Sequence, residues 1–321
     1  MKSNPYLLKR AARNCAAREG GSQSVASPSG REAWIDTVSE EIRTAMQDLT
    51  NAQFPSSLNL IRRWDEFTAG WEKVRHEFSE SSIHDFRVST RRLISELEFA
   101  FAVTHSREVR TSIRKFRKTL RRFGALRDIQ VHLLRAEADG TEYRQFSLFL
   151  KRCEQDEIQV LREWMRDKKK KALQRCLAAA HHKIQDNLTG ISRSVLRAVM
   201  DGILRKRFRA VTASYVSFRS SRQAQDLHRM RVKFKRFRYA AEIARSIPGV
   251  FTKEQMDRMQ ELQGRMGKIH DLQIYMAAIE KWSGTAVPVP LQEEYDALLK
   301  AFNGSPDPFD EFNFHVRTEL Q

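Results

Sequence analysis

The sequence contains two copies of one block, and this repeat limits the folds open to the chain more than any other feature. Residues 83–100 align with residues 227–244, and further along residues 124–137 align with residues 267–280 at nearly the same offset. The identical pairs are His84/His228, Arg87/Arg231, Val88/Val232, Arg92/Arg236, Glu98/Glu242, Ala100/Ala244, Gly124/Gly267, Asp128/Asp271, Gln130/Gln273 and Glu137/Glu280. Two blocks that recur in the same order at one spacing indicate a duplicated structural unit.

The apolar residues of the repeated blocks have the spacing of a helix. On a helix that advances about 100° per residue, Phe86, Leu93 and Leu97 share one side. Only 8 prolines and 13 glycines occur in 321 residues, and no stretch shows the alternation typical of strands. We expect helices over residues 31–50, 57–79, 82–104, 106–138, 142–164, 168–188, 191–218, 223–247, 252–282 and 290–303. The sequence therefore predicts an all-α fold of two pseudo-symmetric antiparallel helical bundles.

The expected helices also suggest where the domain begins and ends. Residues 1–30 are rich in Ser, Gly and basic residues, so we expect a disordered basic tail there. One domain then spans residues 31–303, with the first copy at about 31–188 and the second copy at about 191–303. A C-terminal tail, 304–321, follows the last expected helix.

Three sequence features bear on the cellular location. No apolar run approaches the roughly 20 residues that span a bilayer, so we expect no membrane contact. The N-terminal residues are basic but lack the apolar core of a secretory signal. Three cysteines without a CxxC pair favour a reducing compartment. Together these features predict a cytoplasmic protein.

Charge is the unusual term in the composition. The chain has 57 Lys and Arg against 40 Asp and Glu, a net charge of +17. Such an excess opposes compaction through self-repulsion and is typical of proteins with a polyanionic partner. A solvated basic surface with no dedicated ligand is the plain alternative.

The cations gather on helix faces. In the first copy, His84, Arg87 and Arg91 share the side opposite the apolar residues. The equivalent side of the second copy carries His228, Arg231, Lys235 and Arg238. A third basic stripe follows at i, i+3, i+4 and i+7, formed by Arg114, Arg117, Lys118 and Arg121. Cations at this spacing repel one another unless a polyanion lies along them, and guanidinium groups match phosphoryl oxygens in pairs. The stripes therefore favour a phosphate-rich ligand.

Two carboxylates follow the repeat, at Asp128 and Asp271. We expect each to pair with an arginine or to cap backbone groups. A metal site is not predicted at the repeated histidines, because the ligands are too few and a cationic field repels divalent ions. We expect no cofactor.

These blocks resemble a known family. HDFRVSTRRL at 84–93 and LHRMRVKFKRFRY at 227–239 resemble the paired H-x-x-R-V-x-x-[RK]-R signatures of CHAD, the conserved-histidine α-helical domain. GALRDIQV and GKIHDLQI resemble its second paired signature. Two positions depart from the family pattern: Ile94 stands where the first signature often has a further Arg, and His270 replaces the Arg usual before the second Asp. The resemblance implies two helical bundles around a basic central cavity that binds inorganic polyphosphate, with association with polyphosphate granules. Phosphate or sulfate would act as a surrogate ligand.

By position, the resemblance implies which residues line that cavity. Its matched positions are His84, Arg87, Arg91, Arg92, His228, Arg231, Lys235 and Arg238. To these the helical spacing adds the third basic stripe. The sequence thus predicts a polyphosphate-binding site shared between the two copies.

Two other functions are alternatives to binding of polyphosphate. An enzyme is disfavoured, because the nearest match to the E-x-E-x-K strand of a triphosphate tunnel domain, residues 96–100, lacks the Lys and lies in an expected helix. GRMGK at 264–268 has glycines too close together for a phosphate-binding loop, and no strand precedes it. Nucleic acid binding is the alternative function, since charge alone fits it equally well. The basic stripes, however, lack interleaved aromatic residues for base stacking.

Overall fold

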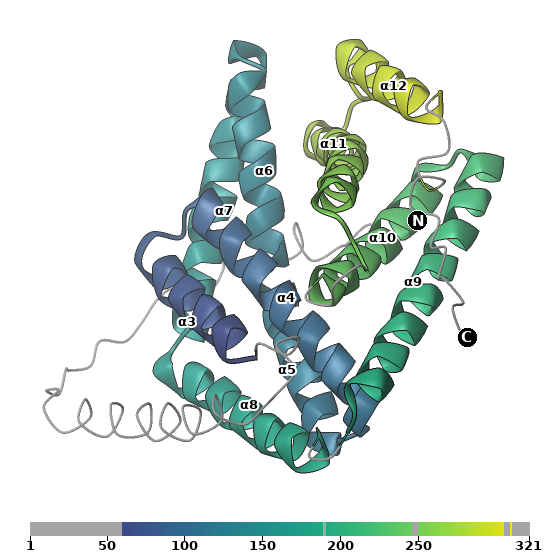
Figure 1. Cartoon of the computed structure of the whole chain (residues 1–321). Coiled ribbons are helices and arrows are strands. Elements are labelled where there is room, and N and C mark those ends of the chain that lie inside the picture. Colours follow the sequence, from purple (N-terminus) through teal and green to yellow (C-terminus); the bar gives the residue numbers. More distant parts are fainter. Residues whose placement is uncertain (1–59, 189–190, 246–249, 305–308, 310–321) are drawn as a thin grey trace, which may run out of the picture.

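The computed structural model describes residues 60–188, 191–245, 250–304 and 309, and every regular element in these ranges is helical (Figure 1). The helices are α3 (Leu60–Glu77), α4 (Glu80–Thr104), α5 (Arg107–Arg122), α6 (Gly124–Ala138), α7 (Arg144–Trp164), α8 (Asp167–Leu188), α9 (Arg193–Ser221), α10 (Ala224–Ala244), α11 (Lys253–Ser283) and α12 (Val289–Asn303), with a 3₁₀ turn, η1 (Thr141–Tyr143), before α7. The all-α prediction is confirmed. The helix expected at 31–50, the tail at 1–30 and most of the tail at 304–321 lie outside the described residues.

The predicted helix at 106–138 is wrong in one respect, because two helices occupy that range. Helix α5 ends at Arg122 and α6 begins at Gly124, and Phe123 between them leaves helical geometry at φ −88° and ψ 7°. Phe123 is fully buried against Phe86, with ring centroids 4.8 Å apart. The equivalent range of the second copy, α11, runs unbroken through Gly267.

Helix ends follow from local chemistry. The Ser79 side chain caps α4 by accepting from the Ser82 amide, and Thr252 and Gln255 form a capping box at the start of α11. Helix α11 ends at Gly284, whose φ of 70° favours a residue without a Cβ. His105 and Arg222 end α4 and α9 at φ 52°, so side-chain-bearing residues occupy the left-handed region at both places.

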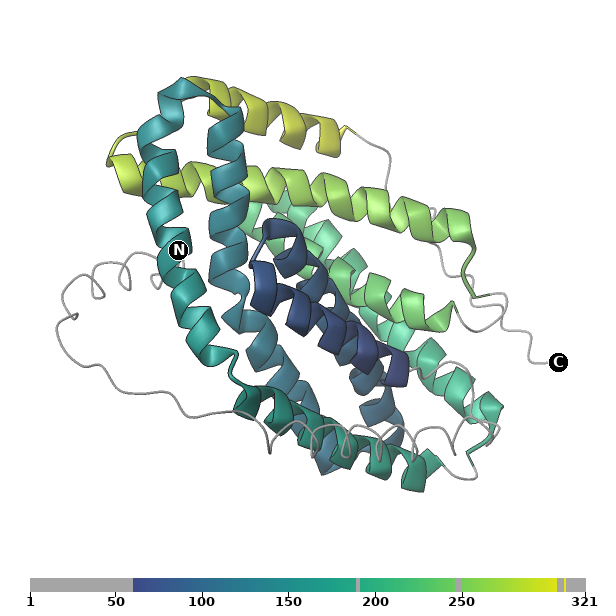
Figure 2. The same cartoon turned by 90° about the vertical axis from the view of Figure 1, so that its left-hand side faces the viewer.

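The two copies pack their elements in the same order. Helix α3 packs on α4 as α9 packs on α10, and α4 packs on α5 as α10 packs on α11. Helix α6 then packs on α7, and α11 on α12, which lies alongside it in Figure 2. Helices α4 and α10, which carry the first repeated block, pack directly against each other.

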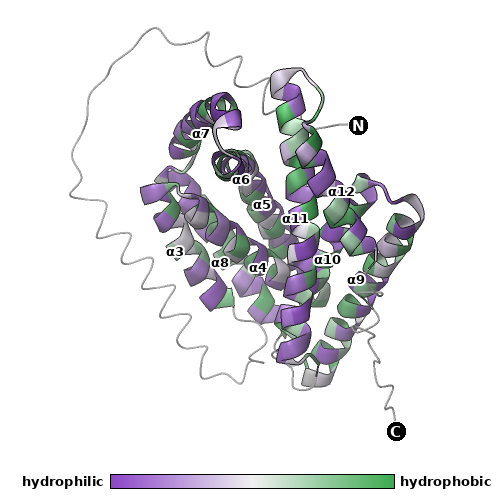
Figure 3. Cartoon of the chain, turned by 90° about the horizontal axis from the view of Figure 1, so that it is seen from above, coloured by the Kyte–Doolittle hydropathy of each residue, from purple (hydrophilic) through white to green (hydrophobic). Residues whose placement is uncertain are grey.

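Apolar faces of the repeat helices form the core. Phe86, Leu93 and Leu97 of α4 are fully buried, as are Phe234 and Phe237 of α10. These are the sides that the helical spacing predicted, so that prediction is confirmed. Figure 3 shows hydrophobic and hydrophilic residues alternating along the helices. Each buried large side chain contributes roughly 1.5–3 kcal/mol, so the core fixes which way the cationic faces point.

Candidate functional site

Helix α4 presents His84, Arg87 and Arg91 along one side, one turn apart. Arg87 is held in place by a hydrogen bond from its Nη1 to the Leu120 carbonyl oxygen, 2.9 Å away. Burial and the neighbouring Arg91 lower the pKa of Arg87 to about 10. Partial burial and Arg127 lower the pKa of His84. The face is therefore a positioned set of cations under mutual repulsion.

Each copy places its repeated arginine beside its repeated glycine. A Cβ atom on Gly124 would lie 3.9 Å from Nη1 of Arg87, and one on Gly267 would lie 3.9 Å from Nη2 of Arg231. Arg231 also pairs with Asp271, one turn past that glycine, at 3.5 Å. The duplicated sequence thus builds the same arginine–glycine arrangement twice.

The repeated aspartates lie near these arginines. Burial raises the pKa of Asp128, Arg87 lowers it, and the nearby Asp271 raises it further. The expected arginine pairing is confirmed for Asp271 by its contact with Arg231. Because Asp128 and Asp271 act on each other, the second repeated blocks also approach one another.

The cationic faces of the two copies converge at Lys235. Burial lowers the pKa of Lys235 to about 6, and Arg231, Arg91 and Arg87 lower it too, against the opposing effect of Asp271. Arg87 and Arg91 come from α4, whereas Arg231 and Lys235 come from α10. We call these four cations, with Asp128 and Asp271, the basic junction. Cations of α4 therefore lie close enough to Lys235 of α10 to act on its charge.

A pair of histidines adjoins the junction in the second copy. Nδ1 of His228 lies 3.2 Å from Nε2 of His270, and the ring centroids are 4.4 Å apart. Burial, Arg231 and His228 lower the pKa of His270 to about 3. In the first copy the position of His270 is taken by Arg127, which pairs with Glu80 at 2.8 Å.

Two predicted site residues are held by a carboxylate of the protein. Arg238 is 7% exposed, and its guanidinium contacts Glu242 at 2.7 Å and Gln263 at 2.8 Å. Arg92 reaches the same Glu242 from α4 at 3.2 Å. Helical spacing placed Arg238 on the open cationic face, and this placement is wrong, because the ion pair buries its charge. We assign Arg92 and Arg238 a part in joining α4 to α10.

The third stripe lies on α5, where all four of its cations are exposed. Arg117 pairs with Glu98 at 2.5 Å, and the other oxygen of Glu98 accepts from Arg207 of α9 at 2.6 Å. Within the described part of the chain, no interaction joins Arg114, Lys118 or Arg121 to the junction. The sequence did not single out Arg127, which pairs with Glu80, or Glu98, which pairs with Arg117 and Arg207. The alignment of Arg127 with His270 in the repeat was the one signal that pointed to Arg127.

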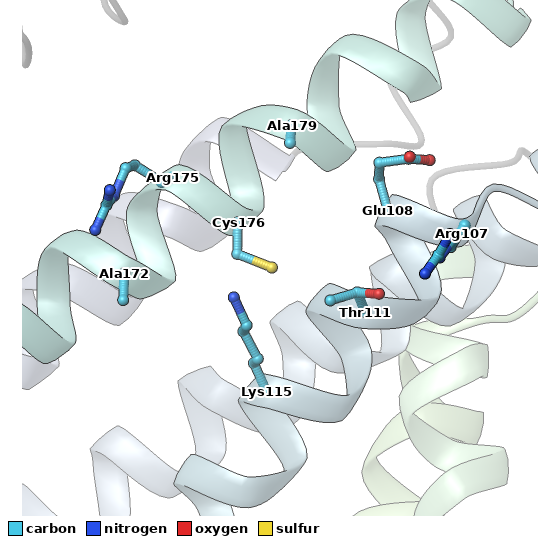
Figure 4. A pocket seen from close by; sticks show the side chains of 8 residues that line it. All are labelled: Arg107, Glu108, Thr111, Lys115, Ala172, Arg175, Cys176 and Ala179. Carbon is cyan, nitrogen blue, oxygen red and sulfur yellow. The ribbon is translucent and has the colours of Figure 1, made fainter.

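One pocket lies apart from the junction, between α5 and α8 (Figure 4). It has a volume of about 460 Å³, and three of its lining residues are cations: Arg107, Lys115 and Arg175. Lys115 points toward Cys176 of the facing helix. None of the predicted site residues lines this pocket, and the central basic cavity stays a prediction.

Among the described residues, no group of three or more His, Cys, Asp or Glu side chains is placed to hold a metal ion. No helix in the same ranges combines the length and apolar character needed to cross a bilayer.

The fold and the junction define a helical module whose two repeated units bring their basic faces together. The model of the CHAD domain family matches residues 60–280, and the chain belongs to that family. The crystal structure of the CHAD domain from the plant Ricinus communis matches with a TM-score of 0.58 at 17% identity, covering 78% of this chain and 86% of that one. No curated protein matches the sequence.

Proposed function

We propose that the protein binds inorganic polyphosphate at the basic junction without catalysing a reaction. The observation that carries this proposal is that α4 and α10 pack against each other and that Arg87 and Arg91 of one helix act on Lys235 of the other. Only Asp128 and Asp271 oppose the three arginine charges within the junction as defined, and Lys235, whose pKa is about 6, gains its charge as an anion approaches. Excess positive charge that burial has partly desolvated gains most from an anionic ligand.

The chemistry of the four cations suits a chain of phosphates. Guanidinium groups bind phosphoryl oxygens through two parallel hydrogen bonds, and charge-assisted bonds of this kind contribute about 1.5–3 kcal/mol each. A flexible polyanion with a charge on every unit can contact α4 and α10 together. Membership of the CHAD family supports the same ligand, which the resemblance of the repeated signatures implied.

Two histidines and the four exposed cations of α5 complete the proposal. His84, His228 and the exposed α5 cations would extend contact with a long chain beyond the junction. A chain that holds polyphosphate in this way would associate with polyphosphate granules in the cytoplasm.

Nucleic acid binding is the alternative function, and one observation weighs against it. The aromatic residue next to the junction, Tyr239, is 5% exposed and lies under the guanidinium of Arg238, 4.8 Å from its ring. It therefore offers no face on which a base could stack.

A binding titration with long-chain polyphosphate and single-stranded DNA at several salt concentrations tests the proposal. We expect tight binding of polyphosphate that strengthens with chain length, and much weaker binding of DNA. The double variant Arg91→Gln, Lys235→Gln should lose about 100-fold or more in affinity, since two charge-assisted contacts disappear.

The matched control is Lys168→Gln, Lys169→Gln, which removes the same charge from the exposed start of α8. Its effect should stay within about threefold of the unmodified protein, because screened distant charges act weakly. Equal affinity for DNA at matched charge, or a larger loss in the α8 control, would overturn the proposal.

A further inference from the structure

The second copy differs from the first at one position beside the junction. Where the first copy has Arg127, a permanently charged residue paired with Glu80, the second has His270, which packs against His228. A histidine can gain or lose its charge near neutral pH, whereas an arginine cannot. The two halves of the junction therefore differ in how they respond to protons.

The geometry of the histidine pair limits its charge. Nδ1 of His228 lies 3.2 Å from Nε2 and 3.4 Å from Nδ1 of His270. At this separation the N–H of one ring can donate to the lone pair of the other, whether the pair is neutral or carries one positive charge. Two imidazolium rings would turn N–H donors toward each other. A second positive charge on the pair is therefore opposed, unless an anion accepts hydrogen bonds from both rings or the rings separate.

The charged groups around the pair act in the same direction. The charges of Arg231 and Lys235 of α10 act on both rings, and Arg87 and Arg91 of α4 act on Lys235. Asp271, next to His270 on α11, is engaged by Arg231. Burial and these cations lower the pKa of both histidines, that of His270 to about 3. The cationic forms thus depend on added negative charge.

We propose that the His228–His270 pair is a proton-linked part of the polyphosphate site, which takes up a proton when the polyanion reaches it. This inference rests on the proposed function. Phosphoryl oxygens next to the rings accept hydrogen bonds and offset the repulsion from Arg231 and Lys235, so they favour the imidazolium form. Binding is then tighter in mildly acidic solution, and the second copy supplies the dependence on pH. The first copy contributes a fixed charge at the equivalent position.

The test compares the unmodified protein with His270→Gln and His270→Arg by titration of long-chain polyphosphate at several pH values. Long chains keep the contribution of their titrating end groups small. Near pH 8 the unmodified protein and His270→Gln should bind equally, because a neutral histidine resembles glutamine in charge. Near pH 6 the unmodified protein should bind about tenfold tighter, as one linked proton requires. His270→Arg should bind tightly at both pH values.

The matched control is His182→Gln on α8, whose side chain is 82% exposed and far along the chain from the pair. It should reproduce the pH profile of the unmodified protein. His228→Gln gives a second measurement of the same coupling if His270→Gln fails to fold, as judged by circular dichroism.

The outcomes separate the two proposals. A ratio of affinities between the unmodified protein and His270→Gln that does not change with pH would overturn the proton linkage and leave polyphosphate binding intact. Absence of binding to polyphosphate at every pH would overturn both. Heats of binding measured in buffers of different ionisation enthalpy should show net proton uptake near pH 7 that His270→Gln reduces.

Discussion

Arg92 of α4 and Glu242 of α10 join the two repeat copies, with Nε of the arginine 3.2 Å from Oε2 of the carboxylate. The other oxygen of Glu242 accepts from Arg238 at 2.7 Å, so one carboxylate holds a cation from each copy. This contact keeps the cationic faces of α4 and α10 in a fixed relation, which a ligand shared between them requires.

Replacement of Glu242 by Gln should destabilise the protein by about 3 kcal/mol, because it leaves the buried guanidinium of Arg238 without its carboxylate. Urea unfolding followed by circular dichroism measures the change. Glu137→Gln is the control, since its ion pair with Lys151 is about half exposed and should contribute less than about 1 kcal/mol. Equal losses in both variants would remove the structural role assigned to Glu242.

The substitution Gly267→Ala, which adds a methyl group, should raise the free energy of unfolding. The residue lies inside α11, and its Cβ would meet Nη2 of Arg231 at 3.9 Å, an ordinary contact distance. Gly→Ala inside a helix gains up to about 1 kcal/mol. Gly264→Ala is the matched control in the same helix, where a Cβ would meet nothing within 4 Å. If Gly267→Ala destabilises while Gly264→Ala stabilises, the arginine needs more room than the structure gives it.

Periodicity predicted the repeat helices and their buried sides because both follow from spacing along one element. Phe86 and Leu93 are buried as expected, and Gly284 caps α11 just past its predicted end at residue 282. His105 also ends a helix in the left-handed region, and nothing in its residue type announces that conformation.

The spacing of residues along one helix could not predict which side chains of different helices form ion pairs. In the sequence, Glu98 and Glu242 stood out only as a matched pair of the repeat, yet each accepts hydrogen bonds from two arginines on two different helices. The break at Phe123 depends on the aromatic cluster that buries its ring, and a helical pattern that continues on both sides conceals it. Such features depend on tertiary packing, so a single sequence shows the candidate cations but not which of them carboxylates neutralise.

Lys235 should make stability depend on pH. Its pKa is about 6 in the folded protein and near the ordinary 10.5 when unfolded, so the unfolded chain binds more protons between these values. The contribution of Lys235 to stability therefore rises as pH increases from about 6 to about 10, and is smallest below pH 6. Lys235→Met removes this penalty and should be more stable than the unmodified protein by a few kcal/mol near pH 6, on the order of 1.4 kcal/mol per unit of displacement.

The difference between Lys235→Met and the unmodified protein should shrink steadily toward pH 10. Unfolding in urea across this range measures it, and the exposed Lys268→Met of α11 serves as control with a change within about 0.5 kcal/mol at every pH. A gain for Lys235→Met that stays constant with pH would mean that packing, and not the displaced proton, is responsible.

Replacement of Glu98 by Gln should change binding and stability in opposite directions. Glu98 holds Arg117 of α5 and Arg207 of α9. Without that carboxylate, the exposed guanidinium group of Arg117 becomes available to a polyanion, so affinity for polyphosphate should increase. The slope of log affinity against log salt should steepen by up to about 0.7, the amount for one added phosphate contact on a single-stranded chain. The free energy of unfolding should fall by about 1–3 kcal/mol, because Arg207 is largely buried.

Glu137→Gln, which removes one charge elsewhere, should change neither the slope nor the affinity measurably. If Glu98→Gln weakens binding while the protein remains folded, then Glu98 orients the cations of the site, and the assignment of Arg117 and Arg207 as neutralised cations is wrong.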